Sequence, residues 1–345
     1  MGAPTEFTRP YATEHEQPNG ENDSRPTAMK VVQDQGLVGR WGDKVVLITG
    51  CNVGIGLETA RAMHATGAKL FITARTQSKG ALAIKDIMAN SPSQAQIEVI
   101  ELELDSLDSV RAAAQTFLTK SKQLNVMITN AGIMAPPHAL TKEGFESQLG
   151  TNHFAHFLLF QLLKPALLSS WTSDFSSRVV TVSSSGHKIS TFDLENTDYS
   201  RTKDYDKWRC YGESKTANIW MANEIERRYG GVGVHAISVH PGPIFTSSLG
   251  RSLTDTDMAV MESFRIPDNV RKTPAQGAAT QVWCATAGEL EGKGGFYAAD
   301  CGVAELGPEK GNYIGLSGYA PHAYDEAGSR RLWDISCDAV GISRD

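Results

Sequence analysis

The feature that most constrains the fold is an alternation, from Asp43 onward, of short β-branched runs with longer amphipathic stretches. This alternation is typical of repeated strand–helix units, which build a parallel sheet. Six runs are predicted to be buried strands, at residues 44–49, 69–73, 97–102, 124–129, 178–183 and 232–239. We therefore predict an α/β fold with a doubly wound parallel sheet and helices on both faces.

The chain has no repeat at a fixed period, and no shift in composition divides residues 41–345. These residues are therefore predicted to form a single domain. Residues 1–40 contain four prolines among polar and acidic residues and lack the apolar run of a signal peptide, so we expect a flexible N-terminal tail. The most apolar later stretch, 154–168, is interrupted by Gln161, Lys164 and Pro165. It is predicted to be a buried helix, not a membrane span.

Charge and cysteine usage exclude several classes of partner. A net charge of -6 gives no basic field for a nucleic acid. The five cysteines are dispersed and include no C-x-x-C pair, which favours reduced thiols in a cytoplasmic protein. No metal site is predicted, because the histidines are not spaced with carboxylates or cysteines as metal ligands would be. Satisfied or solvated histidines are expected at His153, His156, His187 and His240.

A glycine-rich turn follows the first predicted strand and opens a helical stretch at residues 57–65. Gly50 allows the tight turn, Gly54 lets the backbone approach a pyrophosphate, and Gly56 permits close helix packing. The helix N-terminus offers free N–H groups to the anion. A ligand-free turn is the alternative, but the strand and helix context favours a dinucleotide site of the Rossmann type. The residues predicted to bind there are Gly50, Asn52, Gly54, Ile55 and Gly56.

The end of the second predicted strand bears on which dinucleotide binds. An NAD site would place a carboxylate there for the ribose 2′-OH, but this strand ends Thr73-Ala74-Arg75. The Arg75 guanidinium, aided by Lys79, could donate charge-assisted hydrogen bonds to a 2′-phosphate. The alternative is a solvated loop charge. We predict NADP(H) over NAD(H).

Five motifs, in this order, resemble the short-chain dehydrogenase/reductase family. They are Thr49-Gly-x-x-x-Gly-Ile-Gly56, Asn130-Ala131-Gly132, Asn152, Ser184 and Tyr211-x-x-x-Lys215. The resemblance runs from about Trp41 to the C-terminus. It is closest to retinol dehydrogenase-like and WW-domain oxidoreductase-like members through residues 151–159, 239–242 and 332–337.

The tyrosine and lysine can also be interpreted physically. Tyr211 and Lys215 lie four residues apart in a helical pattern, so they share one face. A tyrosine has a reference pKa of about 10, and a nearby ammonium favours the phenolate. Tyr211 would then exchange a proton with the substrate oxygen while a nicotinamide transfers hydride. Ser184 would hold that oxygen; the resemblance favours it over Ser183 and Ser185, which remain alternatives.

The resemblance implies roles for further residues. Asn152 would orient water near Lys215, although an isolated Asn at a helix start is more often a cap. Asp105 would lie beside the adenine ring, with an N-cap as the alternative. A cofactor wall is expected from Asn130, Ala131 and Gly132, and a nicotinamide loop from Pro241, Gly242 and Thr246. In both cases a plain turn is the alternative. A homodimer or tetramer is also implied.

Two long irregular segments, 187–208 and 245–270, are expected to set substrate specificity. The second is rich in apolar residues, so we expect it to cover a bulky lipophilic carbonyl or alcohol, although such residues also pack loops down. The retinol dehydrogenase-like relatives often carry a membrane anchor, which this sequence lacks. That departure favours a soluble enzyme of specialised metabolism. The alternatives are a redox-neutral epimerase or dehydratase on the same fold and a non-catalytic dinucleotide-binding regulator.

Overall fold

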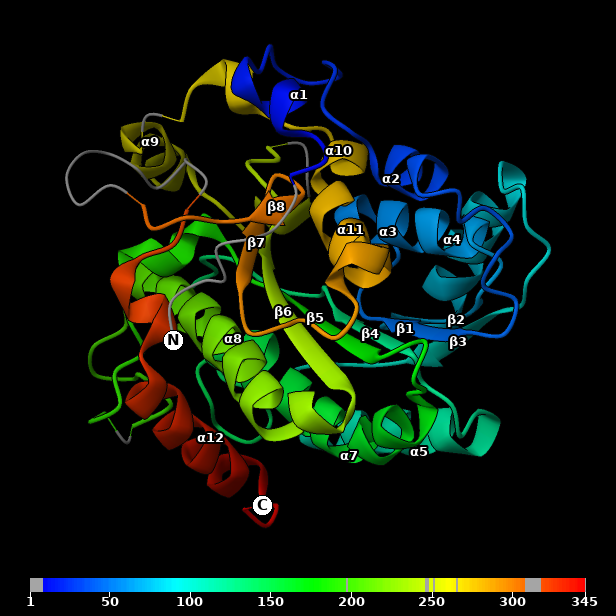
Figure 1. The fold of residues 1–345 in the computed structure, drawn as a ribbon. Helices are drawn as coiled ribbons and strands as arrows, with labels where there is room; N and C mark the ends of the chain where they lie inside the picture. The colour runs from blue at the N-terminus through cyan, green and yellow to red at the C-terminus, as the bar shows by residue number, and fades with distance from the viewer. Residues whose placement is uncertain are drawn as a thin grey trace.

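One sheet of eight strands organises the part of the chain that the computed structural model describes, namely residues 9–196, 198–245, 248–250, 252–264, 266–307 and 318–344. The strand order is β3-β2-β1-β4-β5-β6-β7-β8, and only β7 and β8 pair antiparallel (Figure 1). The strands are β1 (Val45–Ile48), β2 (Lys69–Ala74), β3 (Ile97–Glu101), β4 (Val126–Thr129), β5 (Ser177–Val182), β6 (Val234–His240), β7 (Tyr297–Ala299) and β8 (Gly302–Val303). The order reverses between β1 and β4, and a ligand crevice is expected at the carboxyl ends of the strands there.

Helices cover both faces of this sheet, as expected (Figure 1). On one face lie α3, α4 and α11, and on the other lie α5, α7 and α8, with α12 packed on α7 and α8. The longer helices are α3 (Gly54–Ala65), α4 (Gln77–Ala89), α5 (Leu107–Lys120), α7 (Ala155–Ser170), α8 (Lys207–Tyr229), α9 (Asp255–Ser263), α11 (Ala279–Thr286) and α12 (Glu326–Val340). Shorter helices are α1 (Ala12–Glu16), α2 (Ala28–Asp34), α6 (Ser147–Leu149) and α10 (Pro274–Gly277).

The alternation of side chains along β1 explains why its residues are all apolar. Val45 and Leu47 belong to the core beneath α5, α7 and α8, whereas Val46 and Ile48 belong to the core beneath α3 and α11. Successive strand residues point to opposite faces, so a strand buried on both faces needs apolar side chains at every position. All six predicted strands are present, and the Rossmann-type architecture is confirmed.

The two strands that the sequence did not indicate are very short. β7 has three residues and β8 has two, and β7 contains two alanines and no β-branched residue. Their pairing depends on β6, against which Tyr297, Ala298 and Ala299 align. Tertiary context therefore determines these strands, not local propensity.

The prediction of a flexible tail over residues 1–40 is wrong for residues 9–40. The Thr27 side chain caps α2, and Val31 and Val32 of that helix are fully buried. α2 packs against α3 and α11. The polar and proline-rich composition of the whole segment concealed this short apolar face, whose burial stabilises the ordered conformation.

The apolar helix predicted at residues 154–168 is α7, and its aromatic side chains are core. Phe157 and Phe160 contact Trp333 of α12, with ring centroids 4.9 and 6.2 Å apart. α12 thus covers the outer side of α7 and α8. Across the described ranges, no helix combines the length and apolarity needed to cross a membrane.

The packing of α2 can be tested by truncating its buried face. We expect the double substitution Val31→Ala, Val32→Ala to lower the free energy of unfolding by about 2–4 kcal/mol, because four buried methyl groups are lost. The control is Val38→Ala, since Val38 is 42% exposed. Urea unfolding followed by circular dichroism measures both. Equal stability of the double variant and the wild type would contradict the packing.

Candidate active site

The glycine turn between β1 and α3 is shaped to admit a ligand at the helix N-terminus. Gly50 has φ +72°, and an added Cβ would lie 2.8 Å from the Cβ of Ala131. At Gly56 an added Cβ would overlap the carbonyl oxygen of Gly50 and lie 2.5 Å from Nδ2 of Asn130. Gly54 has φ +63°, and an added Cβ there would have no neighbour within 4 Å. The backbone is therefore crowded behind the turn and open in front of it, as a pyrophosphate site requires.

The turn is held by side chains from the neighbouring strands. Thr73 at β2 accepts a hydrogen bond from the Gly50 N–H through its Oγ1 at 3.1 Å. The Nδ2 of Asn130 donates to the carbonyl oxygens of Thr49 and Gly50, at 2.9 and 3.3 Å. Asn130 thus fixes the conformation of the turn through its side chain. The sequence had indicated a different role for it, as part of the wall of the cofactor site.

The predicted adenosine-side residues lie at the carboxyl ends of β2 and β3. Arg75 directly follows β2 and is exposed, and in the described part of the chain its guanidinium forms no ion pair. Lys79 lies in the first turn of α4, where its N–H donates to Thr76 Oγ1. Asp105 is exposed in the turn before α5, and Ser106, not Asp105, caps that helix. The alternative role of Asp105 as an N-cap is therefore wrong.

The structure distinguishes the three consecutive serines after β5. The Oγ of Ser183 is buried and donates to the carbonyl oxygen of Lys215 at 2.7 Å. Ser184 is partly exposed, and its Oγ accepts from the Gly186 N–H at 3.0 Å. Its side chain lies beside that of Tyr211, since a Cβ added at Gly186 would lie 3.4 Å from Ser184 Oγ and 2.7 Å from Cε1 of Tyr211. The bond from Gly186 uses a lone pair of the Ser184 oxygen, so it leaves the hydroxyl proton for Tyr211 or for a substrate oxygen. Geometry favours Ser184 independently of the resemblance.

Tyr211 and Lys215 lie on one face of α8, but burial governs their ionisation. Desolvation raises the pKa of Tyr211 to about 12, although the hydrogen bond from Ser184 acts in the opposite direction. Desolvation lowers the pKa of Lys215 to about 8. The Nζ of Lys215 donates to the carbonyl oxygen of Val182 at 3.1 Å and lies 5.7 Å from the ring centroid of Tyr211. Burial therefore moves the pKa of Tyr211 in the direction opposite to the expected lowering.

Asn152 lies in a π-helical turn (Gly150–Phe154) that leads into α7. Its side-chain amide pairs with the backbone of Ile133: Oδ1 accepts from the N–H at 2.9 Å and Nδ2 donates to the carbonyl oxygen at 3.0 Å. A Cβ added at Gly132 would lie 3.1 Å from this Oδ1 and 3.5 Å from Nζ of Lys215. Both polar atoms therefore face the same small volume beside Gly132, where a side chain would crowd them.

Three buried histidines hold the backbone segments around these residues. The Nδ1–H of His156 donates to the carbonyl oxygen of Asn152 at 3.0 Å, and its Nε2 lies 3.0 Å from Oγ1 of Thr49. His187 places Nδ1 2.6 Å from the carbonyl oxygen of Ser184, while its Nε2 accepts from the N–H of Ala320 at 3.0 Å. Both arrangements place a proton on Nδ1, and His187 must be neutral because its Nε2 accepts a hydrogen bond.

The third histidine, His240, ends β6. Its Nδ1 accepts from the N–H of Ser185 at 3.2 Å, so its proton lies on Nε2. Burial lowers the pKa of His187 and of His240 to about 3, and that of His156 to about 4. These residues agree with the expectation of satisfied histidines, but isolated histidines in sequence gave no signal of their positions around the site.

The loop after β6 lies close to a buried lysine. Gly242 has φ +96°, and an added Cβ would lie 2.7 Å from Cδ of Lys272. The N–H of Lys272 donates to the carbonyl oxygen of Pro243 at 2.9 Å. Pro241 is buried beside Gly242, while Thr246 lies outside the described residues. The loop therefore has the tight path that the Pro-Gly pattern indicated.

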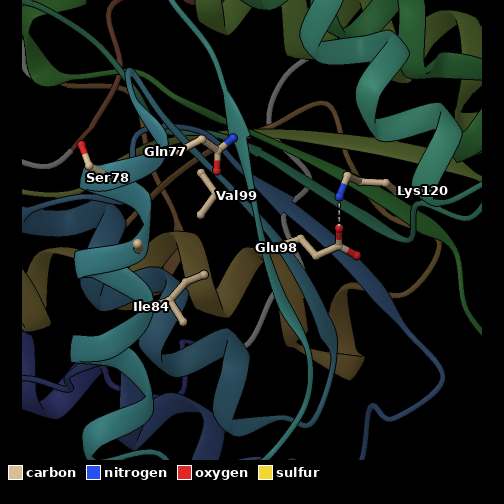
Figure 2. Close-up of a pocket in the computed structure, with 7 residues that line it drawn as sticks. Gln77, Ser78, Ile84, Glu98, Val99 and Lys120 are labelled. Atoms are coloured by element: carbon tan, nitrogen blue, oxygen red, sulfur yellow. Dashed lines mark hydrogen bonds and ion pairs between the residues drawn. The ribbon is translucent and has the colours of Figure 1, made fainter.

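A surface hollow lies at the open edge of the sheet, separate from these residues. Figure 2 shows it beside β3 and α4, with Lys120 of α5 paired to Glu98. Its lining is Gln77, Ser78, Ala81, Ile84, Glu98, Val99 and Lys120. No residue of the serine, tyrosine and lysine group contributes to it. As for metals, the described ranges contain no cluster of three or more histidine, cysteine or carboxylate side chains.

Comparison with known proteins identifies the family. The profile of the short chain dehydrogenase family matches residues 44–257, which include every element from β1 to β6. The chain belongs to the short-chain dehydrogenase family. Its glycine turn and its serine, tyrosine and lysine group lie within the matched range.

Several curated relatives resemble this short-chain dehydrogenase over nearly their whole length. The short-chain dehydrogenase/reductase prx1 of Penicillium roqueforti is 46% identical over 325 residues, covering 94% of this chain and 93% of the relative. The oxidoreductase calI of Penicillium decumbens is 44% identical, covering 96% and 97%. Human retinol dehydrogenase 11 is 38% identical, covering 88% and 87%. The resemblance to retinol dehydrogenase-like members is confirmed.

Solved structures also resemble this short-chain dehydrogenase. A crystal structure of an uncharacterized protein of Mycobacterium paratuberculosis has a TM-score of 0.65 at 29% identity, covering 93% of this chain and 97% of that one. The Pseudomonas aeruginosa RhlG/NADP complex has a TM-score of 0.58 at 23% identity, covering 74% and 94%. The second likeness supports the fold alone.

The buried histidines give this short-chain dehydrogenase a predictable pH dependence. Because their folded pKa values lie near 3 to 4, the unfolded chain binds more protons than the folded one below about pH 6.5. The free energy of unfolding should therefore fall as the pH drops from about 6.5 to about 4, by up to about 1.4 kcal/mol per pH unit for each histidine. The residues concerned are His153, His156, His187 and His240.

Urea unfolding at about pH 7 and about pH 5 measures this slope. Carboxylates also titrate toward the acid end, so the comparison is with His187→Gln, which should reduce the slope by about one proton equivalent. An unchanged slope in that variant would show that His187 is already protonated in the folded protein.

Proposed function

We propose that this protein is an NADP(H)-dependent oxidoreductase that interconverts a carbonyl and a primary or secondary alcohol on a bulky lipophilic substrate. The observation that carries the proposal is the position of Ser184 and buried Tyr211 side by side at Gly186, with Lys215 one helical turn further along α8. This group lies at the carboxyl ends of β5 and β6, on the edge of the sheet where the glycine turn follows β1. Acid–base groups and the anion-binding turn therefore face one crevice.

The residues of the glycine turn suit a nicotinamide dinucleotide, because its backbone is open in front of Gly54. When bound, the nicotinamide supplies or accepts hydride. In reduction, Tyr211 donates its phenolic proton to the carbonyl oxygen, and Ser184 donates a hydrogen bond to the same oxygen. The Gly186 N–H holds Ser184 Oγ in place during this step.

The ionisation of Tyr211 and Lys215 suits the proton transfer that reduction requires. With a pKa of about 12, Tyr211 is protonated at neutral pH and is ready to act as an acid. Lys215, with a pKa of about 8, is mostly charged at neutral pH and stabilises the phenolate that forms.

The preference for NADP(H) is supported by Arg75. Its exposed guanidinium follows β2 directly and has no carboxylate partner among the described residues. It is therefore free to pair with a 2′-phosphate, which a planar guanidinium binds through two parallel hydrogen bonds. Lys79, on the first turn of α4, adds positive charge on the same side.

The lipophilic character of the substrate is supported by the segment around α9. Phe264 at the end of α9 contacts Trp208, three residues before Tyr211, with ring centroids 5.8 Å apart. Asp257 of α9 pairs with Lys207 at 2.9 Å. Met258 of the same helix is 42% exposed. A helix that carries the apolar run 258–261 and is fastened one turn from the proposed catalytic tyrosine suits a bulky apolar substrate.

Net cofactor turnover distinguishes this function from its alternatives. A panel of lipophilic ketones and alcohols with NADPH or NADP should give net oxidation or reduction of the cofactor. We expect Tyr211→Phe to lower kcat by about a hundredfold to ten-thousandfold, because the proton donor is lost while the ring still packs. Redox-neutral product formation would indicate an epimerase or dehydratase, and binding without turnover would indicate a regulator.

The cofactor preference has its own test. We expect Arg75→Ser to raise KM for NADPH by about tenfold to a hundredfold and to leave KM for NADH unchanged, because only NADPH carries the 2′-phosphate. The matched control is Arg330→Ser, which removes an exposed arginine of α12 that pairs with Glu326. A higher kcat/KM with NADH than with NADPH in the wild type would refute the preference.

A further inference from the structure

The buried side chain of Arg25 joins the N-terminal segment to residues 269–271. Arg25 is 4% exposed, and its guanidinium donates to the carbonyl oxygens of Val270 and Arg271, at 2.8 and 2.6 Å, and more weakly to that of Asn269 at 3.4 Å. Its Nε donates to the carboxylate of Asp23 at 2.8 Å. One side chain thus fixes three consecutive carbonyl groups of another segment.

The surrounding residues complete this connection. The N–H of Gly20 donates to the carbonyl oxygen of Asn269 at 2.7 Å. Gln276, in α10, donates to Asp23 Oδ1 at 2.9 Å and accepts from the N–H of Asn22 at 3.2 Å. We call residues 19–25 the N-terminal clamp. Figure 1 shows the N-terminal segment, in blue, running from α1 past α10 to α2.

The segment held by the clamp leads directly to the loop after β6. Lys272 follows Arg271, donates its N–H to the carbonyl oxygen of Pro243, and packs its side chain beside Gly242. The Nζ of Lys272 is fixed by Asp300 at 2.6 Å. Residues 269–271 therefore determine where Lys272 lies, and Lys272 determines where residues 242–243 lie.

A second path runs through α10. An added Cβ at Gly277 would lie 2.7 Å from Cδ1 of Ile244 and 3.6 Å from Cγ1 of Ile55. Ile55 belongs to the glycine turn and Ile244 to the loop after β6. The C-terminal end of α10, which is a single turn, thus packs against side chains of the two segments proposed to hold the cofactor, and the clamp holds this turn through Gln276.

We propose that the N-terminal clamp, through Arg25, is a positioning element for the nicotinamide end of the cofactor site. It sets the position of residues 242–244 from outside the family core, since both 19–25 and 269–276 lie beyond the matched range 44–257. This inference rests on the proposed function. The adenosine end, near Arg75 and Lys79, has no such connection to the clamp among the described contacts.

The choice of an arginine follows from the geometry of its acceptors. A guanidinium has five donors in a fixed fork, so it binds four carbonyl oxygens, that of Gly20 included, and a carboxylate together, whereas a lysine offers one nitrogen. Arg25→Lys keeps the charge that balances Asp23 and removes the fork. The variant therefore separates the loss of positioning from the loss of a buried ion pair.

The test compares the binding of the intact dinucleotide with the binding of its adenosine fragment. Full-length wild type and Arg25→Lys are titrated with NADPH and with 2′,5′-ADP, which carries only the adenosine end; NADH and 5′-AMP form a parallel pair. We expect the Kd for the intact dinucleotide to rise about threefold to thirtyfold and the Kd for the adenosine fragment to stay unchanged. The kcat with a reactive ketone should fall as well, because the nicotinamide is misplaced.

The control is Arg178→Lys. It replaces another buried arginine, at the start of β5, whose guanidinium pairs with Glu291 at 3.0 Å. It should lower thermal stability comparably without changing either Kd. If Arg25→Lys weakened binding of the intact dinucleotide and of the adenosine fragment equally, or weakened neither, the positioning role alone would be overturned. If wild type bound no dinucleotide, the proposed function would fail together with it.

Discussion

The site depends on how α8 is docked against the end of β5. The Oγ of Ser183 donates to the backbone of Lys215, and Nζ of Lys215 donates back to the carbonyl oxygen of Val182. One turn further, Nδ2 of Asn218 donates to the same carbonyl oxygen, and Thr181 Oγ1 donates to the carbonyl of Asn218. These reciprocal bonds fix the rotation and height of the helix on the strand. Tyr211 then meets Ser184 without a direct bond between Tyr211 and the sheet.

Burial gives this docking its chemical effect. The same packing that positions α8 excludes water from Tyr211 and Lys215, and so moves both groups toward their neutral forms. Buried polar groups must be satisfied, and the neutral imidazoles of His156, His187 and His240 satisfy backbone groups at three edges of the site without adding charge. No charged imidazole is thereby added beside Ser184, Tyr211 and Lys215.

Local sequence signals predicted the parts of this structure whose causes are local. β-branched runs located six strands, and the glycine turn and the Tyr-x-x-x-Lys spacing located both ends of the site. Composition failed at residues 9–40, because the two apolar residues that bury α2 are a small fraction of a polar segment. β7 and β8 exist through pairing with β6, and the roles of Asn130 and the histidines arise from contacts between residues distant in sequence. Such contacts produce no periodic pattern of residue types in a single sequence.

The bond from the Ala320 N–H to His187 has a consequence for the order in which the protein becomes active. His187 supports the carbonyl group of Ser184, yet its own partner lies near the C-terminus, as does His322, whose Nε2 lies 2.9 Å from the carbonyl oxygen of His187. During synthesis the central strands emerge and pair first. Ser184 therefore acquires this support only once residues 320–322 have been synthesised and have folded against His187, so a chain that ended before them would carry the sheet without it.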